Sequence, residues 1–241
     1  MKINIVGGNG IMGQVHKPVF ERAGHEVIVT DRVSDIKPEE AAKICDLTII
    51  SVPISVTEEV IKKIAPYCKA IMDFTGLKKF PVETMLKYSP DTCEVGGLHP
   101  LYGNVSSIKN KTVIYCPTEK SREKCNKILE AFEDSGANIE KMSSEKHDLL
   151  VSGISQNARR KLLEAFGLLV KKQGISEKEF YNASPSPTQV LLDLLARQID
   201  ENNDKLYKEM ADFNSFQEQV FRELVECLIE VESSGTVSDK L

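Results

Sequence analysis

Short runs of apolar, β-branched residues alternate with amphipathic stretches from Lys2 to about Lys141. Strands that are buried on both faces have this nearly continuous apolar character, which is typical of a parallel sheet covered by helices. Repeated β-then-α units with short connections therefore predict a doubly wound α/β fold. The predicted strands are 2–6, 26–30, 47–52, 70–74 and 112–116, and the predicted helices are 12–23, 57–65, 82–87 and 121–135.

The second half of the chain has a different pattern, in which apolar residues recur at helical spacing and no strand pattern reappears. Ser144 is the predicted N-cap of a long helix over 145–172, which Gly174 ends. We therefore expect two domains, an α/β domain over 1–142 and an all-helical domain over 143–241. The further predicted helices are 177–182, 188–201, 205–210 and 213–230.

Composition and charge narrow the classes of function. The 241 residues are 41% hydrophobic and 28% charged, as in ordinary soluble globular proteins. The formal net charge of -5 argues against a protein that binds duplex nucleic acid, because such proteins carry a basic face. No apolar run approaches the roughly 20 residues that span a bilayer. Because Met1–Val6 leads directly into a glycine-rich turn, we also expect no signal peptide.

The 6 cysteines are scattered along the chain, without a C-x-x-C pair and without a cluster of cysteine and histidine. This pattern is typical of reduced thiols in a cytoplasmic protein and not of disulfides. It also predicts that the protein has no metal site.

A glycine-rich loop follows the first predicted strand, with the spacing Gly8-x-Gly10-x-x-Gly13. Glycines at these positions permit a tight turn, close approach of a pyrophosphate and close packing of helix on strand, and the helix N-terminus beyond offers N–H groups to the anion. A strand before, a helix after and Asp31 about twenty residues on give the motif its Rossmann-type context. We therefore predict that a dinucleotide binds here. The predicted loop contacts are Gly8, Asn9, Gly10, Ile11, Met12 and Gly13.

The residues after the second and third strands bear on the cofactor. Asp31 can accept hydrogen bonds from both ribose hydroxyls, which favours NAD, whereas Arg32 beside it could neutralise the 2′-phosphate of NADP. Ser51, Val52 and Pro53 leave the third strand where the sheet should face the nicotinamide. A proline that simply ends a strand remains the alternative for that segment.

A nicotinamide enzyme that oxidises an alcohol needs a group that accepts the hydroxyl proton. Histidine is the candidate, because its pKa lies near neutral pH. We expect structural or solvent-facing roles for His16 and His25, and a local hydrogen-bonding role for His147 at a helix start. His99 differs, because it follows a short apolar run and should leave a strand at the edge where such sheets bind ligands. From its position alone, His99 is either a working group or a satisfied turn residue.

The segment around His99, GGLHPLYG, resembles the G-L-H-P-M-F-G signature of prephenate dehydrogenases. VGGNGIMG resembles the glycine loop of that family, TIISVPISVTEEVI its segment beside the nicotinamide, and IMDFTGLKKFP its D-x-x-S-V-K-x-x-P block. VIYCP, EKHDLLVSGIS and SPSPTQVLLDLLARQIDENNDKLY are similar to the family's next strand, its E-H-D-x-x-x-A helix start and its late helices. The motifs follow in the family order over essentially the whole chain.

The resemblance implies a Rossmann-type domain followed by an all-helical domain that makes a homodimer. It implies NAD(P)-dependent oxidative decarboxylation of prephenate to 4-hydroxyphenylpyruvate, on the route to tyrosine, without a metal. His99 would accept a hydrogen bond and then the proton of the ring hydroxyl.

Departures from the family pattern lie at the implied substrate site. Gly76 stands where the family usually has serine, and Thr75 just before it would supply the catalytic hydroxyl. Lys78 fits the lysine of the same block, with a solvated loop charge as the alternative. Arg159 stands where many members have histidine, and Arg197 approximately matches the late-helix arginine that would clamp a carboxylate. The implied substrate contacts are His99, Tyr102, Ser155, Arg159, Arg160 and Arg197, with Gln156 and Asn157 nearby.

Three other functions stay open at this point. An arogenate dehydrogenase would run the same chemistry on a substrate with an amino group in place of the side-chain keto group. A non-catalytic NAD-binding regulator is suggested by Gly76 and Arg159. A β-hydroxyacid dehydrogenase would need a catalytic lysine on the first long helix, where Lys161 and Lys171 occur without the matching motif.

Overall fold

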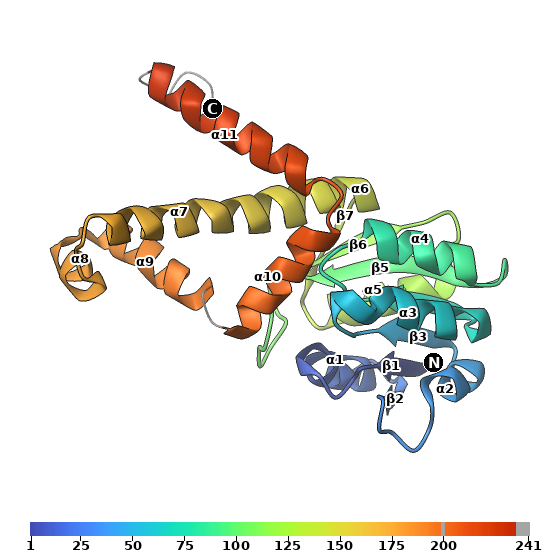
Figure 1. Ribbon diagram of the computed structural model, residues 1–241. Helices are drawn as coiled ribbons and strands as arrows, with labels where there is room; N and C mark the ends of the chain where they lie inside the picture. Colours follow the sequence, from blue (N-terminus) through green and yellow to red (C-terminus); the bar gives the residue numbers. More distant parts are fainter. Residues whose placement is uncertain (199–200, 235–241) are drawn as a thin grey trace. The chain divides into compact units, whose positions relative to one another are not determined.

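The computed structural model describes residues 1–198 and 201–234 of the chain (Figure 1). It divides into two compact units, Met1–His147 and Asp148–Leu241. Within the described ranges, no helix is long and apolar enough to cross a membrane.

The first unit contains a seven-stranded sheet with the strand order β2-β1-β3-β4-β5-β6-β7. The strands are β1 Lys2–Val6, β2 Glu26–Thr30, β3 Leu47–Ile50, β4 Ala70–Asp73, β5 Glu94–Pro100, β6 Thr112–Pro117 and β7 Asn138–Lys141. The helices are α1 Ile11–Arg22, α2 Pro38–Ile44, α3 Ile54–Ile64, the 3₁₀ turn η1 Ala65–Tyr67, α4 Lys79–Tyr88, α5 Glu123–Asp134 and α6 Ser144–His147. This architecture confirms the predicted doubly wound α/β fold.

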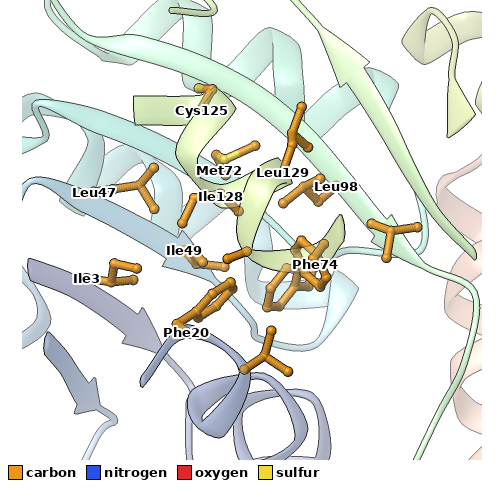
Figure 2. Packing of buried hydrophobic residues seen from close by; sticks show 14 of the residues in the cluster. Ile3, Phe20, Leu47, Ile49, Met72, Phe74, Leu98, Cys125, Ile128 and Leu129 are labelled. Carbon is orange, nitrogen blue, oxygen red and sulfur yellow. The ribbon is translucent and has the colours of Figure 1, made fainter. Parts of the chain in front are cut away.

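Both faces of the sheet are covered by helices, and alternate strand residues supply the two cores. Ile3 and Ile5 belong to the cluster that α1 and α5 complete with Phe20 and Phe132. Figure 2 shows Ile3 and Phe20 within this cluster. Val6 belongs to the opposite cluster, which also contains residues of α2, α3 and α4. Because side chains of a strand point alternately to its two faces, strands buried on both sides must be apolar throughout. This is why the apolar runs of the sequence predicted these strands.

The topology places the ends of five parallel strands along one edge. The chain passes from β1 to β2 on one side and returns to β3 on the other, so the switch point of the sheet lies between β1 and β3. Strands β2, β1, β3, β4 and β5 are mutually parallel. Their carboxyl ends therefore lie side by side, at the position where open α/β sheets bind ligands.

The sheet is not parallel throughout, because β6 pairs antiparallel with β5. The connection between them, residues 101–111, contains no helix. A parallel return needs a longer crossover that usually includes a helix, so this short connection can only bring the chain back antiparallel.

Two elements of the first unit were missed in the sequence. Strand β7 is short and polar and pairs only with β6 at the edge of the sheet, so it has no apolar run. Helix α2 is also short, and it buries only Ala41 and Ala42.

Helix α6 begins one residue before the predicted start, because the hydroxyl oxygen of Ser143, and not that of Ser144, accepts the backbone N–H of Lys146 at 3.2 Å.

The second unit is all helical within its described residues, as predicted. It begins with the π-helical segment η2 Asp148–Ala158, followed by α7 Arg159–Lys172, α8 Glu177–Ala183, α9 Ser186–Gln198, α10 Glu201–Phe213 and α11 Gln217–Ser234. The expected continuous helix over 145–172 is therefore wound in three parts. Gly153 lets α11 approach η2 closely, since a Cβ there would lie 3.2 Å from Cγ2 of Val220. Gly174 ends α7 with a φ of 70°, as its sequence position indicated.

Candidate active site

The glycine loop connects β1 to α1 and packs as its spacing requires. A Cβ on Gly13 would lie 2.2 Å from the carbonyl oxygen of Gly8, and a Cβ on Gly8 would lie 2.8 Å from Cγ1 of Val29. Gly10 is less crowded, with its nearest neighbour, the carbonyl oxygen of Gly7, at 3.2 Å from such a Cβ. Gly10 is also the N-cap of α1 and has no side chain to accept the first-turn N–H groups. The loop therefore fits a bound pyrophosphate.

The residues after β2 and β3 flank this loop. Asp31 follows Thr30, which pairs with Val6 at the end of β1. One carboxylate oxygen of Asp31, Oδ1, accepts the backbone N–H of Arg32 at 2.7 Å. Ser51 donates its backbone N–H to the carbonyl oxygen of Val6 at 2.8 Å, so the segment Ser51–Pro53 lies directly beside the glycine turn.

A buried ion pair lies at the end of β4. Asp73 and Lys78 contact each other with 0% exposure of either side chain, and Nζ of Lys78 also donates to the carbonyl oxygen of Leu98 at 2.7 Å. Burial raises the pKa of Asp73, and the charge of Lys78 opposes that rise. Lys78 is therefore not a solvated loop charge. It ties the end of β4 to the residue that precedes His99.

Thr75 lies two residues beyond Asp73 and is 5% exposed. Its backbone N–H donates to Oδ2 of Asp73 at 3.0 Å. Its hydroxyl oxygen has no partner with good hydrogen-bond geometry among the described residues, although the side chain lies close enough to Asp73 to lower the pKa of that carboxyl. A buried hydroxyl without a partner is costly, so this group is available to a ligand.

We expected His99 to follow its strand. It lies instead within β5, opposite Ile114 of β6. Its side chain is buried, and Nδ1 lies 2.8 Å from Nε2 of His147. Burial lowers the pKa of His99 well below its usual value, and the electrostatic effects of His147 and Lys78 lower it further. His99 is therefore neutral near pH 7 and can accept a proton.

Tyr102 follows His99 in the loop after β5, and its hydroxyl lies 2.9 Å from Nε2 of His16 in α1. Nδ1 of His16 lies 2.7 Å from the carbonyl oxygen of Met12, so Nδ1 carries the proton and Nε2 accepts from Tyr102. Burial lowers the pKa of His16 to about 4, which keeps this acceptor neutral. The hydroxyl of Tyr102 thus connects the His99 loop to the helix that follows the glycine loop.

The expected substrate residues of the second unit have varied surroundings. Ser155 and Arg159 are exposed, and Arg159 donates to the hydroxyl of Tyr207 at 3.3 Å. Arg160 forms ion pairs with Glu164 and Asp204. Arg160 and Asn157 line a pocket of about 340 Å³ within this unit, together with Lys161, Glu164, Asp204, Tyr207, Lys208, Ala211, Asp212 and Phe221. Arg197 belongs to α9, and its side chain lies outside the described residues.

Sequence reasoning missed the partner of His99. We expected only a local helix-start role for His147, whereas its ring contacts His99 across 48 residues of sequence. The E-K-H-D motif was visible, but it gives no direction for the side chain. The link between His16 and Tyr102 likewise left no periodic signal.

Comparisons with known proteins identify the family of this chain. The family described as "Prephenate dehydrogenase, nucleotide-binding domain" matches residues 7–141, which is more than half of the chain. A probable arogenate/prephenate dehydrogenase of Methanocaldococcus jannaschii is 29% identical over 234 residues, which cover 89% of this chain and 52% of that protein. The T-protein of Haemophilus influenzae is 32% identical over 179 residues, which cover 73% of this chain and 46% of that protein. The chain thus spans about half the length of these curated relatives.

A solved structure shares the fold. The crystal structure of prephenate dehydrogenase from A. aeolicus, in complex with hydroxyphenyl propionate and NAD+, superposes with a TM-score of 0.63 at 20% sequence identity. The match covers 97% of this chain and 96% of the other. The resemblance seen in the motifs is confirmed by the family match, and so is the expectation of a nucleotide-binding domain. The chain belongs to the prephenate dehydrogenase family.

Proposed function

We propose that the protein is a NAD-dependent prephenate dehydrogenase that converts prephenate to 4-hydroxyphenylpyruvate. The observation that carries this proposal is His99, a buried and neutral histidine on β5. Strand β5 belongs to the same sheet as β1, which the glycine loop follows. Family membership supports the reaction class, and the domain roles follow from it. We assign cofactor binding to 1–142 and substrate binding and dimerisation to 143–241.

The glycine loop and its flanking residues would hold the cofactor. Gly8 to Gly13 would surround the pyrophosphate, Asp31 would bind the adenosine ribose, and Ser51 to Pro53 would lie beside the nicotinamide. Asp31 favours NAD, and the adjacent, exposed Arg32 leaves NADP as the alternative cofactor. When bound, the nicotinamide supplies the hydride acceptor for oxidation of the ring alcohol, and aromatisation then expels the ring carboxylate as CO₂.

His99 would take the hydroxyl proton in this reaction. Among the described residues, Nδ1 of His99 has His147 as its hydrogen-bond partner and Nε2 has none, so Nε2 is the atom that can face the substrate. The unpartnered hydroxyl of Thr75 would hydrogen-bond the same substrate group or the nicotinamide amide. Both groups lie in a buried environment, which strengthens such contacts.

The negative charges of the substrate need cations. Arg159, Arg160 and Arg197 remain the proposed carboxylate contacts, with Ser155 and Tyr102 as further substrate contacts. Arg159 is the stronger candidate of the first two, because the guanidinium of Arg160 is already bound by Glu164 and Asp204. An arginine that gives up two carboxylate partners for one substrate carboxylate gains little.

We also propose that the second unit makes a homodimer and that the enzyme acts in the cytoplasm. Large apolar side chains that are more than half exposed support a dimer: Leu168, Leu169, Val190, Val225, Leu228 and Ile229. Such a concentration of exposed apolar residues is typical of an interaction surface. The five described cysteines of the first unit are buried free thiols, as a reducing compartment would leave them.

The direct test is the initial rate with prephenate or arogenate, each with NAD or NADP. We expect NADH formation with prephenate and NAD to be the fastest of the four. A faster rate with arogenate would establish the alternative substrate, which the name of the Methanocaldococcus jannaschii relative supports equally. No turnover on either substrate, with NAD still bound, would overturn the proposal and support a non-catalytic regulator.

A further inference from the structure

A histidine pair is the least ordinary feature of the site. Nδ1 of His99 and Nε2 of His147 lie 2.8 Å apart, and the rings meet edge to face at 66°. His99 is 8% exposed and His147 is 0% exposed. His147 comes from α6, a single turn that Ser143 caps and that packs against α4 and β6. The pair is therefore formed by two separate elements that are each held in place by backbone structure.

Only one proton can lie between the two nitrogens. If Nδ1 of His99 donates it to Nε2 of His147, Nε2 of His99 keeps a lone pair and can act as a base. If His147 donates instead, Nε2 of the neutral His99 carries the proton and cannot accept another. The role of His147 thus determines whether His99 is in its working tautomer.

The charges around the pair favour a neutral His99. Lys78, at the start of α4, lies close enough to lower the pKa of His99, and it is itself paired with Asp73 of β4. From β6, the residue opposite His99 is the apolar Ile114. Among the described residues, no carboxylate hydrogen-bonds His99. His147 therefore stands in the position where many catalytic histidines have an acidic partner.

We infer that His147 is a positioning residue, which accepts the Nδ1 proton of His99 and so keeps Nε2 of His99 free to take the substrate proton. After proton transfer, the same hydrogen bond would hold the imidazolium of His99. A neutral partner stabilises that imidazolium less than a carboxylate would, so the pair gives a weaker base that stays unprotonated to lower pH. This inference rests on the proposed function of His99.

The test compares His147→Gln with His147→Leu in the full chain. The Gln side chain can still accept a hydrogen bond near the position of Nε2, whereas Leu cannot. We expect His147→Leu to lower kcat by about 10–100-fold, the size of effect seen when a metal-ligating histidine loses its orienting partner, with Gln restoring part of it. KM for NAD should change little. In His147→Leu the acidic limb of kcat/KM should move to lower pH, because the imidazolium of His99 loses the acceptor of its Nδ1–H.

Ser143→Ala is the matched control, since it removes the cap of α6 without touching either ring. It should lower stability but leave the pH profile in place. Nitrogen-15 NMR of histidine-labelled protein provides a readout without turnover, in which Nδ1 of His99 should be protonated and Nε2 should not. An unprotonated Nδ1, or a kcat of His147→Leu within twofold of the parent, would overturn the inference. If the parent has no activity but the NMR tautomer is as expected, the proposed function fails and the pairing stands.

Discussion

At the scale of single residues, the proposed reaction needs His99 to be neutral and correctly oriented. Burial supplies the neutrality, because an imidazolium loses more hydration than a neutral ring when it leaves water. The charge of Lys78 adds to the effect. The sequence indicated His99 through its glycines and its strand, but side-chain directions come from packing, which left His147 unrecognised.

Replacement of His99 tests its proposed role as the base. His99→Asn removes the base and keeps a small polar side chain, so kcat should fall by about 10²–10⁴-fold. The dissociation constant for NAD, measured by fluorescence titration, should stay nearly unchanged because the residue lies outside the phosphate loop. An undiminished kcat would remove His99 from the mechanism.

At the scale of elements, the helices and strands that could be predicted are those whose burial requires a regular pattern of apolar residues. Strands β1 to β4 and β6 were found because both faces are covered, although β3 and β4 end one or two residues early. Strand β7 and helix α2 were missed because a polar edge strand, and a helix that buries only two residues, need no recognisable pattern of apolar residues. The π-helical winding of η2 was also missed, since helical periodicity in the sequence does not distinguish it from an α-helix.

Two glycines of the same loop should respond differently to alanine. In Gly13→Ala the new methyl would lie 2.2 Å from a backbone oxygen, so the loop or α1 must shift. We expect a loss of about 1–3 kcal/mol in stability, as for other overpacked sites. In Gly10→Ala the nearest atom is 3.2 Å away and the backbone φ is -74°, so stability should hold while NAD binding weakens.

Thermal unfolding and NAD titration of both glycine variants separate the two effects. A stable Gly13→Ala protein would mean that the loop packs less tightly than described. Unchanged NAD affinity in Gly10→Ala would mean that the pyrophosphate does not approach this turn.

At the scale of the molecule, the structure combines a nucleotide-binding sheet unit with a helical unit whose described surface exposes many apolar residues. The fold class, both domain types and the family could be predicted from the sequence because several motifs occur in order. Substrate contacts could not, because they depend on which arginines other side chains already occupy, as Arg160 shows.

The stability of the first unit should fall in mild acid because of His16. The pKa of folded His16 is about 4 against 6.5 in the unfolded chain, so the unfolded state binds more protons between these values. The contribution is complete above about pH 6.5 and declines as pH falls toward 4, by about 3 kcal/mol in total.

Amide hydrogen exchange of β1 and α1 from pH 7 to pH 4.5 would measure this decline. His16→Phe removes the titrating group in a site already lined by Phe20, Phe74 and Phe132, so its pH dependence should be flatter. Equal slopes for parent and variant would show that His16 does not resist protonation.

The proposed reaction of this chain is the oxidation and decarboxylation of prephenate with NAD. The most direct measurement is the product balance of the purified protein with those two compounds, by absorbance for NADH, chromatography for 4-hydroxyphenylpyruvate and trapping for CO₂. We expect equal amounts of all three products. NADH without CO₂, or no product from prephenate while NAD still binds, would contradict it.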